Sequence, residues 1–296
     1  MSLHTIADFI RFAYTRMNEA EVSFGHGFDN AWDESVYLVL SSLYLPWDFD
    51  QSLWSCRLEK DERKRLHHLI DERVKRRIPS AYLVRQAWFA GAPYYVDERV
   101  LVPRSPIGEL INKQYSPWLP HEPDQIMDLC TGSGCIGISS ALAFEDAQVA
   151  LVDISSDALD VASTNIMKHE VGDRVSAFKS DVFDGLGLEH QGRYDLIVSN
   201  PPYVDARDLD EMPLEFGHEP VLGLAAGPDG LDIVVRILRQ AKDFLNPEGV
   251  LIVELGNSWV ALEQRYPDFP FTWIEFEHGG HGVFVMSAQE LKSREW

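Results

Sequence analysis

The stretch MDLCTGSGCIGI, residues 127–138, decides the fold. It joins a short apolar run to three glycines, Gly132, Gly134 and Gly137, in the spacing G-x-G-x-x-G. Glycines at these positions permit a tight turn between a strand and a helix, and they let backbone N–H groups approach a ligand closely. The stretch therefore predicts the first strand, loop and helix of an α/β sheet that binds a nucleoside cofactor.

Beyond residue 105, apolar runs typical of strands alternate with helical periodicity. Such alternation predicts a mostly parallel sheet with helices on both faces, and ligands that bind beyond the carboxyl ends of the strands. The last two strands flank the glycine turn HGGHG and are expected to be antiparallel. The expected strands are 125–130, 148–154, 175–180, 195–199, 249–255, 271–276 and 283–286, and the expected helices lie near 134–144, 156–168, 229–245 and 258–265.

The chain divides into three parts. Residues 1–79 carry apolar side chains at helical spacing and predict a small all-α domain. Residues 80–104 are rich in valines and aromatics broken by Gly91 and Pro93, which predicts a β-hairpin linker. Residues 105–296 form the α/β domain, for which we expect a seven-stranded, Rossmann-like sheet with an antiparallel C-terminal hairpin.

Composition limits the classes of function. The formal net charge is −21 at pH 7, which argues against broad binding to nucleic acid and favours basic partners. Three scattered cysteines, Cys56, Cys130 and Cys135, indicate a reducing compartment rather than a disulfide framework. Neither a signal peptide nor an apolar window of 18 residues is visible, so we expect a cytoplasmic protein.

Three aspartates lie at the ends of expected strands. Asp153 follows Gly132 by 21 residues, where a carboxylate can bind ribose hydroxyls. Asp128 can orient the glycine loop, approach the charged end of a cofactor or cap a turn, and the sequence leaves these open. Asp181 can accept the exocyclic amine of adenine or fill a turn. The loop motif itself fits nicotinamide and S-adenosylmethionine cofactors equally well.

The fourth expected strand ends in NPPY, residues 200–203. Pro201 and Pro202 forbid a helix, hold the backbone extended and leave carbonyl groups free to accept hydrogen bonds. With the Asn200 side chain, these acceptors can hold both N–H bonds of a planar –NH₂ group, and Tyr203 can stack on that group. Orienting such a weakly nucleophilic nitrogen promotes methyl transfer without a metal. The motif therefore predicts methylation of a planar amide or amine nitrogen.

Several motifs together resemble one family, the protein-glutamine N5-methyltransferases of the HemK/PrmC/PrmB type. They are DLCTGSGCIGI, VDIS, SNPPYVD and HEPVLGLAAGPDGL, and the resemblance spans nearly the whole chain. VPRSPIGEL at 102–110, together with stretches at 23–46 and 77–83, is most similar to the PrmB branch. The resemblance implies a class I methyltransferase fold and S-adenosyl-L-methionine as the methyl donor. It also implies, as substrate, a glutamine of the third protein of the large ribosomal subunit (L-three), which is basic.

The strand-end pattern and the resemblance together give the candidate site. The expected cofactor-binding residues are Asp128, Thr131, Gly132, Ser133, Gly134, Asp153, Asp181, Val182 and Asn200. The residues expected to bind and orient the glutamine are Asn200, Pro201, Pro202 and Tyr203. Arg104 is a candidate either to anchor the hairpin or to meet the substrate. No metal is expected, because His278 and His281 lie too close to a glycine turn and have too few partners to form a metal site.

Other functions share parts of this pattern. Release factors are the substrates of a related branch of the family, and NPPY also occurs in enzymes that methylate nucleic-acid bases. A non-catalytic assembly factor or a nicotinamide dehydrogenase would share the fold and loop. Residues 57–77 carry nine Lys and Arg against five Asp and Glu, which fits either a solvated helix or a surface that contacts ribosomal RNA in an assembly intermediate.

Overall fold

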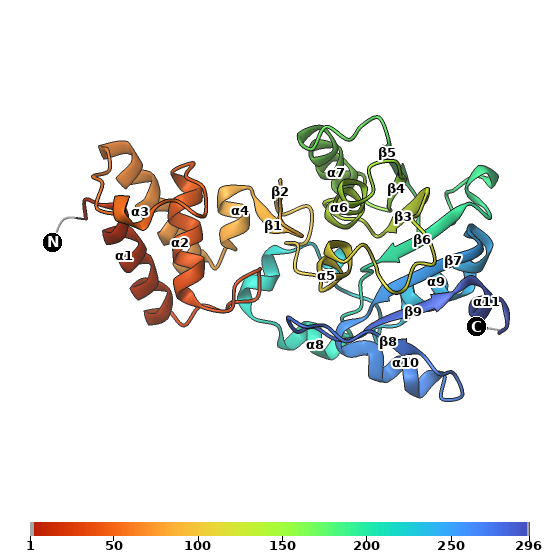
Figure 1. Cartoon of the computed structure of the whole chain (residues 1–296). Coiled ribbons are helices and arrows are strands. Elements are labelled where there is room, and N and C mark those ends of the chain that lie inside the picture. Colours follow the sequence, from red (N-terminus) through yellow and green to blue (C-terminus); the bar gives the residue numbers. More distant parts are fainter. Residues whose placement is uncertain (1–2, 295) are drawn as a thin grey trace.

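The computed structural model describes residues 3–294 and 296. A helical N-terminal unit lies at one end, and a short hairpin connects it to a layered α/β unit (Figure 1). Helices α1, α2 and α3 pack on a common apolar core, in which Phe9, Leu38 and Leu66 are completely buried. Their bounds are α1 Ile6–Glu19, α2 Ala31–Ser42 and α3 Lys60–Arg76.

The α/β unit is built on a seven-stranded sheet with the order β5-β4-β3-β6-β7-β9-β8. The first five of these strands are parallel, and β9 pairs antiparallel with both β7 and β8. The chain leaves β3 toward β4 and β5 and then crosses to β6, so the strand order reverses beside β3. The bounds are β3 Gln125–Leu129, β4 Gln148–Asp153, β5 Val175–Lys179, β6 Tyr194–Ser199, β7 Leu245–Glu254, β8 Thr272–Trp273 and β9 Val283–Ser287.

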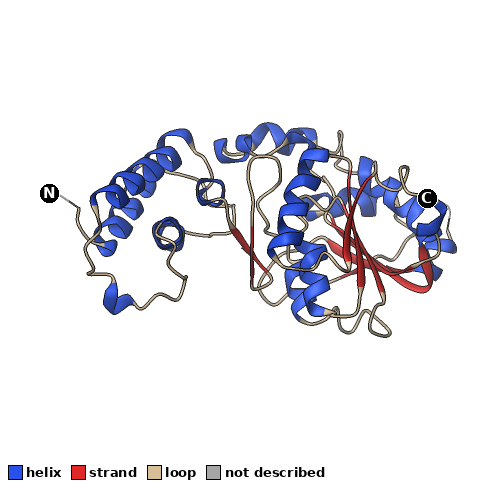
Figure 2. Cartoon of the chain, turned by 90° about the horizontal axis from the view of Figure 1, so that it is seen from above, coloured by secondary structure: helices blue, strands red, loops and turns tan. Residues whose placement is uncertain are grey.

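Two layers of helices cover the sheet (Figure 2). Neighbouring residues of a strand enter different cores: Leu196 and Val198 of β6 pack with α5, α6 and α7, whereas Ile197 packs with α9, α10 and α11. Because side chains alternate across a strand, such two-sided burial requires the continuous apolar runs seen in the sequence. These helices are α5 Ile107–Asn112, α6 Cys135–Ala143, α7 Ser156–Lys168, α9 Asp232–Phe244, α10 Trp259–Arg265 and α11 Ala288–Lys292.

The predicted β-hairpin linker is only partly correct. Strands β1 (Ala87–Phe89) and β2 (Ala92–Tyr94) form it, but Ser80–Val84 is the short helix α4. Pro79 begins this helix, and Arg85 ends it in the left-handed conformation. Residues 95–106 contain a turn at 98–99, pair with no strand and pack their valines on α7. Apolar content alone therefore overestimated the length of the hairpin, because burial rather than pairing explains the valines.

The sequence predicts the seven strands of the main sheet within a few residues, and the antiparallel C-terminal pair is confirmed. That pair is not joined by a tight turn, since β8 ends at Trp273 and nine residues precede β9. Helix α8 (Ala206–Glu211) and the 3₁₀ turn Leu214–His218 were not expected. Within the described residues, no helix is long and apolar enough to span a membrane.

Candidate active site

A cavity of about 320 Å³ lies at the carboxyl ends of β3, β4, β5 and β6, beside the reversal of strand order. The glycine loop, Asp153, Asp181 and the NPPY motif all line it. Of the predicted site residues, those that line this cavity are Thr131, Gly132, Ser133, Asp153, Asp181, Val182, Asn200, Pro201, Pro202 and Tyr203. Residues that are far apart in the sequence thus meet where parallel sheets bind ligands.

The glycine loop needs glycine for two different reasons. Gly132 has φ +55, and a Cβ added to it would meet no atom within 4 Å, so it borders open cavity space. Gly134 has φ +81, and its Cβ would lie 3.0 Å from Ile138 and 3.1 Å from Leu151. The first glycine therefore leaves room for a ligand, and the second lets α6 pack closely on the sheet.

Asp128 and Gly134 are the two predicted site residues outside the cavity lining. Asp128 is fully buried below the loop, where it accepts hydrogen bonds from Thr131 Oγ1 at 2.5 Å and Gly137 N at 2.9 Å. Burial raises its pKa to about 7, although both hydrogen bonds oppose the shift. Of the roles that the sequence leaves open, this geometry favours orientation of the loop.

Asp153 connects the loop to the next helix. Its carboxylate accepts a hydrogen bond from Gly132 N at 2.9 Å and another from Ser155 N at 2.9 Å. Burial raises the pKa of Asp153, while the bonds from Ser155 and Gly132 oppose the rise. At the neighbouring strand end, Asp181 is exposed and pairs with Arg236 Nη1 at 2.7 Å.

The NPPY motif continues β6 into the cavity. Ser199 Oγ donates to Leu129 O at 2.8 Å and fixes the ends of β6 and β3 together just before Asn200. Tyr203 OH donates to Glu254 Oε1 at 3.2 Å, and Ser258 Oγ donates to Tyr203 O at 2.6 Å. The rigid extended backbone and these bonds give the motif a fixed position at the cavity wall.

Glu254, which the sequence analysis missed, supports this wall from β7. It is buried, and Ser105 Oγ donates to its Oε2 at 2.5 Å, beside the contact with Tyr203. Burial raises the pKa of Glu254 to about 7, while the bonds from Ser105 and Tyr203 oppose the shift. No local motif marks this residue, because its partners are 149 and 51 residues away.

Arg104 lines the cavity, and its guanidinium forms a two-pronged contact with Glu219, at 2.6 Å to Oε1 and 2.7 Å to Oε2. Burial would raise the pKa of Glu219, but the nearby His26 ring and the Arg104 guanidinium hold it at about 2. The same carboxylate accepts Val102 N at 2.9 Å. Arg104 therefore both anchors the linker and faces the cavity.

The cysteines, His281 and the charged residues of the basic segment 57–77 have ordinary surroundings. Burial raises the pKa of the Cys135 thiol to about 12, so it stays protonated, and all three cysteines are free. His281 Nε2 lies 2.9 Å from Asn257 Oδ1 in the glycine turn. In the basic segment, Lys75 pairs with Asp71 and Arg76 pairs with Glu72, which are the ion pairs expected of a solvated helix.

A parallel sheet with a glycine loop, an acid at the end of the second strand and NPPY after the fourth defines an S-adenosylmethionine-dependent methyltransferase. The open space beside Gly132, the carboxylate of Asp153 and the acceptor groups of Asn200 suit such a cofactor and a planar nitrogen. The model of the family "Methyltransferase small domain" matches residues 116–215.

Two curated relatives extend over almost the whole chain. One, the ribosomal protein uL3 glutamine methyltransferase of Francisella tularensis, is 50% identical over 98% of this chain and 92% of its own. The protein of the same name from Neisseria gonorrhoeae is 46% identical over 99% of this chain and 97% of its own. The chain belongs to the family of uL3 glutamine methyltransferases, which confirms the resemblance seen in its sequence.

Solved structures support the fold. The hMettl16 catalytic domain, in complex with an RNA hairpin, superposes with a TM-score of 0.52 at 15% identity, over 78% of this chain and 82% of its own. At that identity the similarity concerns the Rossmann-like methyltransferase architecture alone, and the choice of substrate must come from the site.

Proposed function

We propose that this protein transfers a methyl group from S-adenosyl-L-methionine to the side-chain amide nitrogen of one glutamine in ribosomal protein uL3. The observation that carries this proposal is that the NPPY motif, residues 200–203, lines the same cavity as the glycine loop. The names of the two full-length relatives support the choice of substrate. A ribosomal protein as substrate also favours a cytoplasmic location.

The chemistry follows from the weakness of an amide nucleophile. The cofactor supplies a methyl group on a positively charged sulfur. When the S–C bond breaks, the sulfur keeps its electron pair. The side-chain oxygen of Asn200 and the carbonyl of Pro201 accept the two amide N–H bonds, so that the nitrogen faces the methyl group. One amide proton leaves after the N–C bond forms. The ring of Tyr203, held by Glu254, closes the pocket beside the amide.

The remaining site residues serve the cofactor in this proposal. Asp153 binds the ribose hydroxyls, and the loop Thr131–Gly134 surrounds the charged end. Asp181 and the buried Val182 flank the adenine, with Val182 supplying an apolar contact rather than a stack. Asp128 acts indirectly by holding Thr131 and Gly137.

The test is methyl transfer from labelled cofactor by wild-type protein and Asn200→Ala. Loss of one acceptor should reduce turnover about 30-fold to 1,000-fold, by analogy with the 2–4 kcal/mol lost with one oxyanion-hole donor. Asn18→Ala is the matched control, because the Asn18 side chain donates to Tyr14 O on the remote helix α1. If Asn200→Ala kept more than about a third of wild-type turnover, the role of the motif would be wrong.

The same assay separates the alternative substrates. Free uL3, a release factor and nucleic acid are offered in parallel, and methylation of uL3 alone is expected. The net charge of −21 opposes nucleic acid as the substrate, because binding to phosphates relies on cationic side chains. Methylation of the release factor at a higher kcat/KM than uL3 would contradict the proposal.

The finer question is whether uL3 is modified free or within an assembly particle that contains RNA. We propose that contact with RNA, in such a particle, uses the exposed cations Lys60, Lys64 and Arg65 of α3. Arg65 lies 5.5 Å from the ring of Tyr44, which is 87% exposed and offers a surface for stacking. Replacing the three cations by Gln should slow methylation of the particle and leave free uL3 unaffected. If the variant kept the same fraction of the wild-type rate on both substrates, RNA contact would be removed from the proposal.

A further inference from the structure

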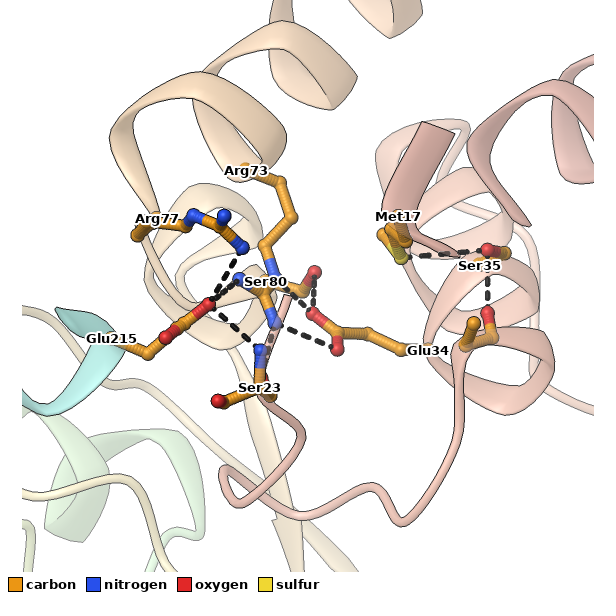
Figure 3. Close-up of polar contacts among 9 residues, drawn as sticks. Met17, Ser23, Glu34, Ser35, Arg73, Arg77, Ser80 and Glu215 are labelled. Atoms are coloured by element: carbon orange, nitrogen blue, oxygen red, sulfur yellow. Dashed lines mark hydrogen bonds and ion pairs between the residues drawn. The ribbon is translucent and has the colours of Figure 1, made fainter. Parts of the chain in front are cut away.

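The segment 213–224, after NPPY and α8, has two faces with different neighbours. Phe216, Pro220 and Leu222 line the methyl-transfer cavity. Glu215, directly before Phe216 in the sequence, is only 2% exposed and lies against the helical N-terminal unit (Figure 3). One short stretch of backbone thus forms both the wall of the site and part of the contact between the two units.

Glu215 meets three donors from the N-terminal unit. Its Oε1 accepts Ser23 N at 2.9 Å, and it lies 3.3 Å from Arg73 Nη1 and 3.4 Å from Arg77 Nη1. The pKa of Glu215 is lowered: burial would raise it, but the Ser23 N–H and Arg73 outweigh that effect. The carboxylate is therefore ionised at neutral pH.

Arg73 is itself held from the other side. Its Nε donates to Glu34 Oε1 at 2.5 Å, its Nη2 donates to Glu34 Oε2 at 3.1 Å, and Nη2 also donates to Ser23 O at 2.8 Å. Ser80 Oγ donates to Glu34 Oε1 at 2.6 Å. Figure 3 shows how these side chains converge between α2, α3, α4 and the 3₁₀ turn.

The group contains two guanidinium and two carboxylate charges, so its formal net charge is zero. Arg73, Glu34 and Glu215 are each at most 3% exposed, and taking such charges out of water is costly. A buried ion pair of this kind is weak evidence for stability, because apolar residues of similar volume often serve as well. The ion pairs do fix orientation, because a guanidinium binds a carboxylate only within a narrow range of angles. They therefore hold the Glu215 side chain, and the backbone that carries it, in one position.

A second set of contacts holds the same segment four residues later. Glu219 binds Arg104 and lies 3.5 Å from His26 Nε2, and the His26 ring packs 4.5 Å from the ring of Phe216. His218 Nε2 also lies 2.7 Å from Arg76 O at the end of α3. The position of the cavity wall is therefore set by the N-terminal unit and Arg104 together.

We infer that Glu215, through Arg73 and Arg77, is a positioning residue for methyl transfer, by which the N-terminal unit sets the cavity wall at Phe216. The inference rests on the proposed function. It differs from simple substrate docking, because the N-terminal unit then affects the chemistry of any glutamine in the cavity, including one on a peptide too short to reach that unit. The cofactor residues at the ends of β3, β4 and β5 do not contact Glu215, so the inference predicts no effect on cofactor binding.

The test uses the full chain with Glu215→Gln, which keeps an oxygen for Ser23 N–H but loses the charge. The peptide substrate carries the glutamine identified by mass spectrometry in uL3 methylated by the wild type. We expect kcat on this peptide to fall about tenfold, with cofactor affinity by calorimetry within about twofold of wild type. Arg77→Gln, at a side chain that is 23% exposed, should act in the same direction without burying an unpaired charge.

A second measurement does not depend on the substrate. Hydrogen exchange of the amides in 213–224 should become faster in Glu215→Gln. Asp71→Asn, the loss of one carboxylate charge at an exposed ion pair on α3, is the control and should leave exchange and rate unchanged. Failure of the wild type to methylate uL3 would reject the proposed function, and exchange would still test the positioning role. Unchanged exchange in 213–224, or a loss confined to KM for intact uL3, would overturn the inference.

Discussion

Asp153 contacts the glycine loop directly as well as facing the cavity, which sharpens the effect expected of its removal. Asp153→Ala should raise the dissociation constant for S-adenosylmethionine about tenfold or more and lower kcat much less, because the ribose is remote from the methyl group. Calorimetry and initial rates at saturating cofactor measure the two effects. Asp157→Ala, an exposed acid in the first turn of α7, is the control. An unchanged affinity would contradict the role given to Asp153.

Glu254 should make stability depend on pH. Its pKa is about 7 in the folded protein against 4.5 ordinarily, so the folded state binds the proton more tightly. Its contribution to the free energy of unfolding is therefore complete below about pH 4.5 and is lost as pH rises through 7. Relative to wild type, Glu254→Gln should gain stability between pH 5 and pH 8, by at most about 3 kcal/mol. Urea unfolding at both pH values measures this, and a pH-independent difference would refute it.

At this scale, the sequence predicts a site residue when its partners lie within a few residues of it in the chain. The glycine loop and NPPY are recognisable because each carries its chemical requirement within a few residues. The contacts of Glu254 and Glu219 are not, because their partners Ser105 and Arg104 are 149 and 115 residues away. Asp128 could be located but not assigned, since its role depends on how α6 packs against β3.

At the scale of elements, Gly137 controls how closely α6 approaches the sheet. A Cβ there would collide with the side chain of Leu151 on β4 and lie 2.9 Å from Asp128 Cβ. Gly137→Ala should therefore lower the free energy of unfolding by about 1–3 kcal/mol, as expected for overpacking. Gly172→Ala is the control, because its added Cβ would meet Ile166 at an ordinary 3.5 Å. Equal denaturant midpoints for Gly137→Ala and wild type would show that the helix has room to move.

Elements with strong periodicity were predicted well, and those whose backbone is satisfied by side chains were not. Strands β3, β4, β6, β7 and β9 of the main sheet are buried on both faces, so their apolar runs are long and unambiguous. Residues 95–104 were predicted as part of the hairpin, but Val102 N donates to the Glu219 carboxylate rather than to another backbone group. The 3₁₀ turn at 214–218 was missed because it has no apolar periodicity. It begins after Pro213, and Glu215 within it pairs with the distant Arg73.

At the scale of the molecule, the way the two units join was not accessible from the sequence. The decisive contact joins Arg73 to Glu215, 142 residues apart, and each residue alone is an unremarkable charged side chain. Part of the basic segment 57–77 is thereby explained: Arg73 and Arg77 belong to the interior contact, while Lys75 and Arg76 form surface pairs.

The overall charge also predicts how uL3 is captured. An acidic protein with net charge −21 attracts a basic substrate, and that attraction weakens as the Debye length falls from about 10 Å at 0.1 M salt to about 3 Å at 1 M. We therefore expect kcat/KM for free uL3 to fall steeply across a salt series. A short neutral peptide with the same glutamine should lose little, because it has no charge to be steered. Initial rates on both substrates test this, and since Glu215 acts inside the protein, Glu215→Gln should shift both curves without changing their slopes. Flat rates for uL3 would exclude electrostatic capture and leave the exposed apolar side chains of the segment 213–224, Leu214, Val221 and Leu222, as the main source of affinity.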